Sequence, residues 1–135
     1  MKEIHFCEVC GTSYGIEMHH RVFRSECKPL ERCKLNHVYL CSNHHRGTYG
    51  VHGREGNKLN RKLKLELQNK LEMLFDKREL TEEEINEVLQ ISEKALQRLL
   101  KTLTLHKGKY VREDVIRACM GGKLIEGVKE WTHKK

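Results

Sequence analysis

The sequence has few aromatic residues, a single proline and no long apolar run. Phe, Trp and Tyr make up 6% of the 135 residues, which limits the hydrophobic core to a modest size. No segment, including the opening MKEIHFCEVC, is apolar enough for a signal peptide or a membrane span. The one proline, Pro29, leaves the rest of the chain free to form long helices. We therefore expect a soluble, cytoplasmic protein whose small core needs an additional stabilising cross-link.

Cysteine and histidine residues can supply this cross-link by binding a metal ion. All but one of the six cysteines and all but two of the nine histidines precede residue 58. In a reducing compartment, cysteines in CxxC spacing indicate metal binding more often than a disulfide, which stays as the alternative. A CxxC followed by Gly11 and a later CxxH provide four ligands for a closed tetrahedral site, so we predict structural Zn²⁺ at Cys7, Cys10, Cys41 and His44. The competing Cys27 and Cys33 have a looser spacing, and we expect them in a loop outside the site.

The segments between these ligands have the pattern of two strands and a helix. EMHHRVF alternates its side chains as a strand does, and NHVYLC is apolar and β-branched enough to be its neighbour. From Asn57 to about Asp76, leucines recur at steps of three and four and predict an amphipathic helix with the stripe Leu59, Leu63, Leu67, Leu71 and Leu74. Such a ββα unit, with histidines on a strand and at the head of a helix, could hold a second, open metal site.

The carboxy-terminal half reads as short helices. Thr81 and Glu84 form a capping box, and Ser92 can cap another helix after a short turn. A last helix is expected from about Val111 to Met120, with Cys119 as a buried thiol and Trp131 covering the core.

The stretch TEEEINEVLQISEKALQRLL resembles helix-turn-helix DNA-binding proteins, with Ile85, Leu89, Ile91, Leu96 and Leu99 at their buried positions. Asn86 and Gln90 depart from the pattern, which prefers a small residue and a turn glycine there. The resemblance implies that the second helix presents Glu93, Lys94, Gln97, Arg98 and Lys101 to the major groove, and of these Lys94, Gln97, Arg98 and Lys101 are the expected DNA contacts. A plain helical hairpin that packs on the rest of the chain, or on a second copy, is the alternative.

The ordered pieces CEVCG, EMHHRV, NHVYLC and CSNHHRG, from Cys7 to about Leu74, are similar to HNH endonucleases of the zinc-stabilised ββα-metal type. The resemblance is greatest to the small versions of bacteriophages and prophages. It implies that His20 is the general base, that Asn36 is the central asparagine, and that His19 and His45 hold a catalytic Mg²⁺, Mn²⁺ or Ni²⁺. The family more often has aspartate at the position of His19.

Further residues keep alternatives open. Arg21 and Arg46 are candidate phosphate contacts, whereas His37 and His52 have no clear counterpart in the family. His52, in GVHG, could be a substitute ligand, a phosphate contact or structural. Each catalytic residue also has a non-catalytic alternative. His19 and His20 could be a surface pair, or one of them could be the fourth zinc ligand in place of His44. Asn36 could cap a loop, and the ring of His45 could be solvated.

The net charge of +7 and the pI of about 9.2 favour a polyanionic partner. We expect an α+β protein with a zinc-bound HNH unit at residues 1–76 and a helical, helix-turn-helix-like region at residues 80–135. The function expected is a metal-dependent DNA endonuclease, phage- or prophage-encoded and working in the bacterial cytoplasm. The alternatives are an inactive zinc-containing DNA-binding regulator and an interaction module of a phage or host complex. A homodimer and a phage or host protein partner stay open.

Overall fold

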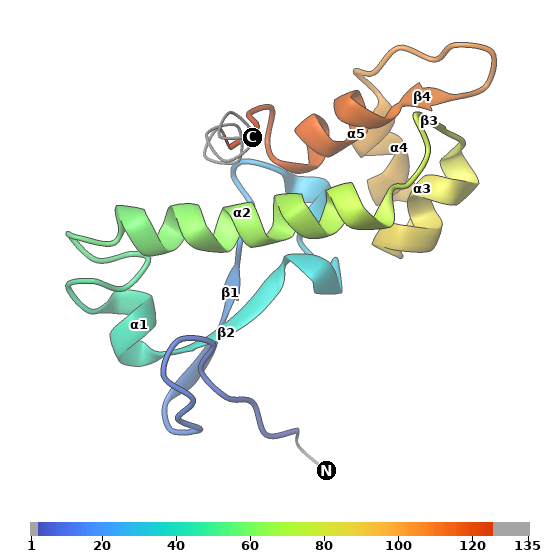
Figure 1. Cartoon of the computed structure of the whole chain (residues 1–135). Coiled ribbons are helices and arrows are strands. Elements are labelled where there is room, and N and C mark those ends of the chain that lie inside the picture. The colour runs from blue at the N-terminus through green and yellow to red at the C-terminus, as the bar shows by residue number, and fades with distance from the viewer. Residues whose placement is uncertain (1–2, 126–135) are drawn as a thin grey trace.

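The computed structural model describes residues 3–125 and shows an α+β fold (Figure 1). The fold class expected from the sequence is thus confirmed at this level. None of the helices in residues 3–125 has the length and apolar character needed to cross a membrane. In chain order the elements are β1 (Ile16–His20), η1 (Lys28–Leu30), η2 (Lys34–Asn36), β2 (His37–Cys41), α1 (Ser42–Arg46), α2 (Asn57–Leu74), β3 (Glu79–Leu80), α3 (Glu82–Leu89), α4 (Glu93–Leu100), β4 (Tyr110–Val111) and α5 (Arg112–Cys119).

The strands β1 and β2 pair in antiparallel register, as the sequence pattern predicts. Ile16 lies opposite Cys41 at one end of the pair, and His20 lies opposite His37 at the other. Helix α1 follows β2 directly and is little more than one turn long. The hairpin and α1 therefore bring the amino-terminal CxxC segment close to the CxxH segment.

A glycine-spaced loop joins α1 to α2. The amides of Gly50, Gly53 and Gly56 each donate to the carbonyl of the glycine three residues earlier, at 2.8–3.2 Å. A Cβ on Gly53 would lie 1.7 Å from the carbonyl oxygen of Gly47, so a residue with a side chain does not fit there. This close folding holds the loop, which contains His52, against α1.

Helix α2 runs across the molecule and connects its two hydrophobic clusters (Figure 1). Leu63 packs with β2 residues and the zinc-ligand region, whereas Leu67 and Leu71 pack with the carboxy-terminal helices. Leu74, predicted to complete the stripe, is 42% exposed because the helix ends there, and Phe75 is buried in its place. The helix is therefore the main connection between the two halves of the molecule.

Helices α3 and α4 begin at the predicted caps. Thr81 and Glu84 form the complete capping box, and the Ser92 hydroxyl accepts from the amide of Ala95. The turn between the helices contains Gln90 in the left-handed conformation, with φ 52° and ψ 49°. Asn86 uses its side-chain amide to bond both the N–H and the C=O of Ile91, at 3.0 Å each. Of the two residues that depart from the helix-turn-helix pattern, Gln90 thus lies in this turn and Asn86, within α3, bonds to it.

The larger hydrophobic cluster contains residues from both predicted domains. Cys27 and Cys33 lie in it, in the loops that flank η1 and outside both groups of metal ligands, as expected. Both thiols are also buried, because η1 and its flanks pack on α4. Cys119 is fully buried in the same cluster, as predicted. The expected position of Trp131 lies outside the described residues. The domain boundary between residues 76 and 80 stays a prediction, and the shared core indicates that the two regions support one another.

Candidate metal centres and the histidine cavity

Cys7, Cys10, Cys41 and His44 come together at one end of the hairpin, with all ligand atoms within 4.8 Å of one another. The Cys7 and Cys41 sulfurs lie 3.6 and 3.3 Å from His44 Nδ1, and the Cys10 and Cys41 sulfurs are 3.9 Å apart. A tetrahedral zinc with ordinary bond lengths has ligand–ligand edges of about 3.5–3.8 Å. These four side chains could therefore hold zinc, as the sequence predicts.

The backbone around Cys7 favours a thiolate. Burial raises the pKa of the Cys7 thiol, but hydrogen bonds from the backbone at Cys41, Cys10 and Val9 outweigh it and lower the pKa to about 6. Gly11, which follows the CxxC, has φ 80° and donates its amide to the carbonyl of Cys7 at 2.9 Å. Within the segment that this bond closes, the amide of Val9 donates to the Cys7 sulfur at 3.4 Å and favours the thiolate, the form that binds a metal.

A second group, made of His19, His45 and His52, also has its ligand atoms within 4.8 Å of one another. His19 is only 3% exposed, and its Nε2 is buried without a hydrogen-bond partner. A buried, unpaired polar atom is costly unless it binds a group such as a metal ion. Burial, with smaller contributions from His45 and His52, lowers the pKa of His19 to about 3. The ring is therefore neutral at neutral pH and has a lone pair for a cation.

Glu17 lies behind this cluster and is not among the site residues predicted from the sequence. Its carboxylate accepts a hydrogen bond from His45 Nδ1 at 2.5 Å, and a second from Arg46 Nε at 3.0 Å. These two hydrogen bonds lower the pKa of Glu17. Because Nδ1 of His45 donates to the carboxylate, Nε2 is the nitrogen left for a metal, an arrangement common behind metal-binding histidines. The signal in the sequence is that Glu17 and His19 are two residues apart and share one face of the strand.

His52 is brought to the cluster by the glycine-spaced loop. Its amide donates to the carbonyl of His45 at 2.9 Å, and the rings of His45 and His52 have centroids 4.8 Å apart. The sequence left three readings of His52 open, and the geometry favours that of a ligand. The signal that was available is the spacing of Gly47, Gly50 and Gly53 around it.

His20 lies on the opposite face of β1 from His19 but borders the same cavity, which has a volume of about 730 Å³. Its Nε2 donates to the carbonyl of Glu31 at 2.9 Å, so its Nδ1 carries no proton when the ring is neutral. His37, opposite His20 in the register, donates to the same carbonyl at 2.9 Å. The residues that line the cavity are Met18, His19, His20, Phe23, Arg24, Ser25, Lys28, His45 and His52.

Asn36 is fully buried and holds the loop that carries Glu31. Its Oδ1 accepts from the amide of Val22 at 2.8 Å, and its Nδ2 donates to the carbonyls of Val22 and Leu30 at 2.9 and 3.3 Å. Leu30 directly precedes the residue whose carbonyl orients His20. Asn36 therefore fixes the loop by bonding backbone carbonyls.

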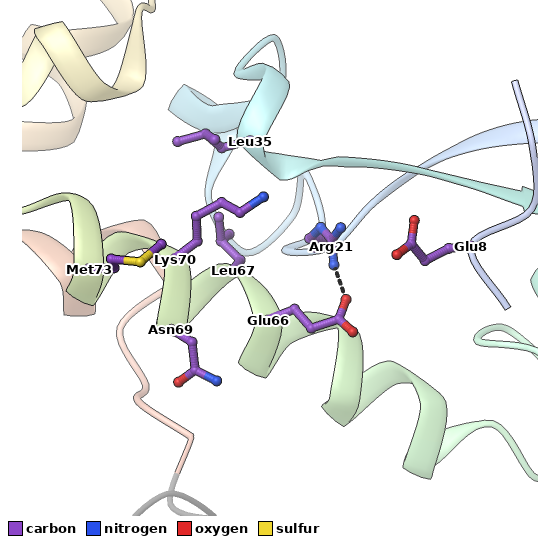
Figure 2. Close-up of a pocket in the computed structure, with 8 residues that line it drawn as sticks. All are labelled: Glu8, Arg21, Leu35, Glu66, Leu67, Asn69, Lys70 and Met73. Carbon is purple, nitrogen blue, oxygen red and sulfur yellow. Dashed lines mark hydrogen bonds and ion pairs between the residues drawn. The ribbon is translucent and has the colours of Figure 1, made fainter.

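The two arginines predicted to contact phosphate differ in their surroundings. Arg21 has a side chain that is only 12% exposed and donates to Glu66 Oε1 at 2.6 Å and to the carbonyl of Leu63 at 3.2 Å (Figure 2). Its guanidinium is thus paired with α2, beside a separate cavity of about 410 Å³ that contains none of the cluster histidines, and its role as a phosphate contact stays a prediction. Arg46 is paired with Glu17, but its side chain is 69% exposed and stays accessible.

The four residues predicted to contact DNA are exposed: Lys94, Gln97 and Arg98 on α4, and Lys101 directly after it. Gln97 donates to the carboxylates of Glu82 and Glu93 at 3.0 and 2.8 Å, so its amide is occupied within the helix pair. The cationic side chains of Lys94 and Arg98 border a cavity of about 250 Å³ between α4 and η1.

Comparisons with protein-family models, with curated proteins and with solved structures found no match to this chain. The case for a function therefore depends on the geometry of the two metal-ligand groups and on the surfaces around them.

Proposed function

We propose that the protein is a metal-dependent endonuclease that hydrolyses phosphodiester bonds in DNA. The observation that carries the proposal is the buried, unpaired Nε2 of His19 beside His45 and His52, in the cavity that His20 also borders. Three protein ligands with an accessible side are typical of a catalytic site, whereas the four-ligand site is closed and typical of structural zinc. The similarity of the sequence to HNH endonucleases supports the same function.

The three imidazoles would hold the catalytic cation. Such a donor set suits Ni²⁺ or Zn²⁺ better than Mg²⁺, which prefers oxygen ligands. When bound, the cation supplies positive charge next to the scissile phosphate and the leaving 3′ oxygen. Glu17 fixes the ring of His45 through Nδ1, and burial keeps His19 neutral, so both rings can offer nitrogen lone pairs.

His20 acts as the general base in this proposal. Its Nε2–H is held by the Glu31 carbonyl, so Nδ1 is the atom that takes a proton from the attacking water. Asn36 positions this carbonyl by bonding the neighbouring Leu30 carbonyl. Arg46 and the basic residues at the rim of the cavity hold the phosphate backbone, and the products carry a 5′ phosphate and a 3′ hydroxyl.

The test is cleavage of supercoiled plasmid by zinc-loaded protein with added Ni²⁺, Mn²⁺ or Mg²⁺. We expect His20→Ala to lower the rate roughly 10²- to 10⁴-fold, as loss of a general base does, while duplex binding changes little. His106→Ala, an exposed histidine outside the cavity, is the matched control and should cleave like the wild type.

Two results would contradict the proposal. Comparable cleavage by His20→Ala would remove His20 from the chemistry. Absence of cleavage with every metal, with DNA binding retained, would instead favour a zinc-containing DNA-binding regulator.

A further inference from the structure

The cavity that contains the histidines does not end at the metal ligands. On one side it is lined by Arg24 and Lys28, of which Lys28 begins η1. Lys28 also lines the second cavity, between η1 and α4, together with Arg32, Lys94 and Arg98. One lysine thus belongs to both hollows, and the surface between the histidines and α4 is continuous.

This surface is strongly cationic. Its five cationic residues are all exposed, namely Arg24, Lys28, Arg32, Lys94 and Arg98. Among the described residues 3–125, the one carboxylate that lines either cavity is that of Glu31. Glu31 pairs with Lys28 at 2.7 Å and with Arg24 at 3.4 Å. Four positive charges are therefore left uncompensated on the surface, which we call the η1 track.

We infer that the η1 track, the surface formed by Arg24, Lys28, Arg32, Lys94 and Arg98, binds the phosphate backbone of one DNA duplex that extends from the histidine cavity to α4. The inference rests on the proposed function, which it deepens by assigning the path of the substrate. Double-stranded DNA presents closely spaced phosphates along its length, and a row of cations matches this pattern by releasing counterions.

The lining of the second cavity favours a duplex over a single strand. Proteins that bind single strands combine positive charge with aromatic side chains on which bases stack. Among the described residues that line the hollow between η1 and α4 none is aromatic, and its non-ionic members are Pro29, Ile91, Ser92 and Ala95. Contacts of this kind hold phosphates and set the position of the duplex without reading its sequence.

The packing explains why the track is rigid. Helix α4 packs directly on η1, and Leu30 of η1 is fully buried in the cluster that contains Leu96 and Leu99 of α4. The nuclease cavity and α4 are therefore held in one arrangement, so phosphate contacts at Lys28 and Arg32 would set the distance from α4 to the scissile bond.

The experiment measures the salt dependence of binding for a labelled duplex and for the corresponding single strand. We use zinc-loaded protein in the His20→Ala background without added catalytic metal, so that the DNA stays intact. Replacing both Lys28 and Arg32 with Ala should weaken duplex binding regardless of sequence and lower the slope of log K against log salt by about 2, since each lost phosphate contact removes about 1. The control variant replaces Lys109 and Lys123, both exposed and outside the two cavities, and should keep the wild-type slope.

The outcomes distinguish a failure of the η1 track as a DNA-binding surface from a failure of the proposed nuclease activity. If the Lys28 and Arg32 double variant keeps the wild-type slope and affinity, the track is overturned, even where metal- and His20-dependent cleavage of plasmid is observed. If the slope falls as expected but no metal supports cleavage, the track stands and the proposed nuclease activity fails. Tighter binding of the single strand than of the duplex would also overturn the assignment, because the track would then follow a different substrate.

Discussion

At the scale of single residues, the most informative side chain is one that carries no ligand atom for the proposed metal. Glu17 pairs with His45 Nδ1 and thereby selects Nε2 as the free nitrogen of that ring. It also lies on the strand that carries His19, so β1 supplies both the candidate ligand His19 and the carboxylate that orients the candidate ligand His45. The orientation of the His45 ring thus depends on a carboxylate that sequence motifs did not single out.

We predict that Glu17→Gln lowers the affinity of the three-histidine cluster for Ni²⁺ by about 10- to 100-fold, because the ring of His45 loses a charged hydrogen-bond acceptor. The affinity is measured by titration calorimetry on protein loaded with a single equivalent of Zn²⁺, which the thiolate-containing site takes first, so that the closed site is filled and the histidine cluster is free. Glu55→Gln, which changes an exposed carboxylate in the neighbouring loop, should bind Ni²⁺ as the wild type does. Equal affinities for wild type and Glu17→Gln would mean that Glu17 does not support a metal ligand.

At the scale of elements, the turn between α3 and α4 contains a residue with a strained backbone conformation, which a glycine would relieve. Gln90 adopts the left-handed conformation that a side chain disfavours and that glycine accepts readily. The neighbouring Asn86 stabilises the turn through both of its bonds to Ile91. The absence of a glycine at this turn has therefore not prevented the two helices from forming.

Gln90→Gly should raise the free energy of unfolding by about 0.5–1 kcal/mol, since the relief of strain exceeds the extra chain entropy of glycine. Urea denaturation in saturating zinc provides the measurement. Glu87→Gly, an exposed position inside α3, is the matched control and should lower stability by somewhat less than about 1 kcal/mol. If Gln90→Gly lowered the free energy of unfolding, the Gln90 side chain would contribute more stability than its left-handed backbone conformation costs.

At the scale of the whole molecule, two hydrophobic clusters of unequal size share α2. The smaller cluster, next to the four predicted zinc ligands, consists of Cys7, Val38, Leu40, Cys41, Val51 and Leu63. The larger cluster includes η1 and the carboxy-terminal helices. A small cluster of this kind buries little apolar surface, so metal binding should contribute much of its stability.

Removal of zinc by a chelator should therefore loosen the molecule unevenly. We expect the backbone amides of β1 and β2 to lose protection from hydrogen exchange, whereas those of α3, α4 and α5 keep most of theirs. Exchange followed by mass spectrometry, before and after chelation, measures this directly, and re-addition of Zn²⁺ should restore the protection. A uniform loss of protection would indicate that the described chain unfolds as a single unit.

Part of the architecture follows from local sequence. The capping box of Thr81 and Glu84 and the cap at Ser92 are interactions within four residues, so the starts of α3 and α4 are determined by the chain itself. The same holds for the close spacing of Cys7 with Cys10 and of Cys41 with His44, which makes each pair a bidentate unit before the fold forms. The two strands were also predictable, because alternation and β-branching are properties of short segments.

Other features were decided only by the tertiary structure, because they join segments that are distant in the chain. Arg21 is a free cation in the sequence, and its commitment to Glu66 depends on how α2 crosses the hairpin. His52 meets His19 and His45 only because the glycine-spaced loop folds back on α1, and Cys33 becomes a core residue only because its segment packs on the carboxy-terminal helices. The sequence by itself determined which residue types could bind metal and where helices begin; the packing of α2, η1 and α4 decided which of those residues meet.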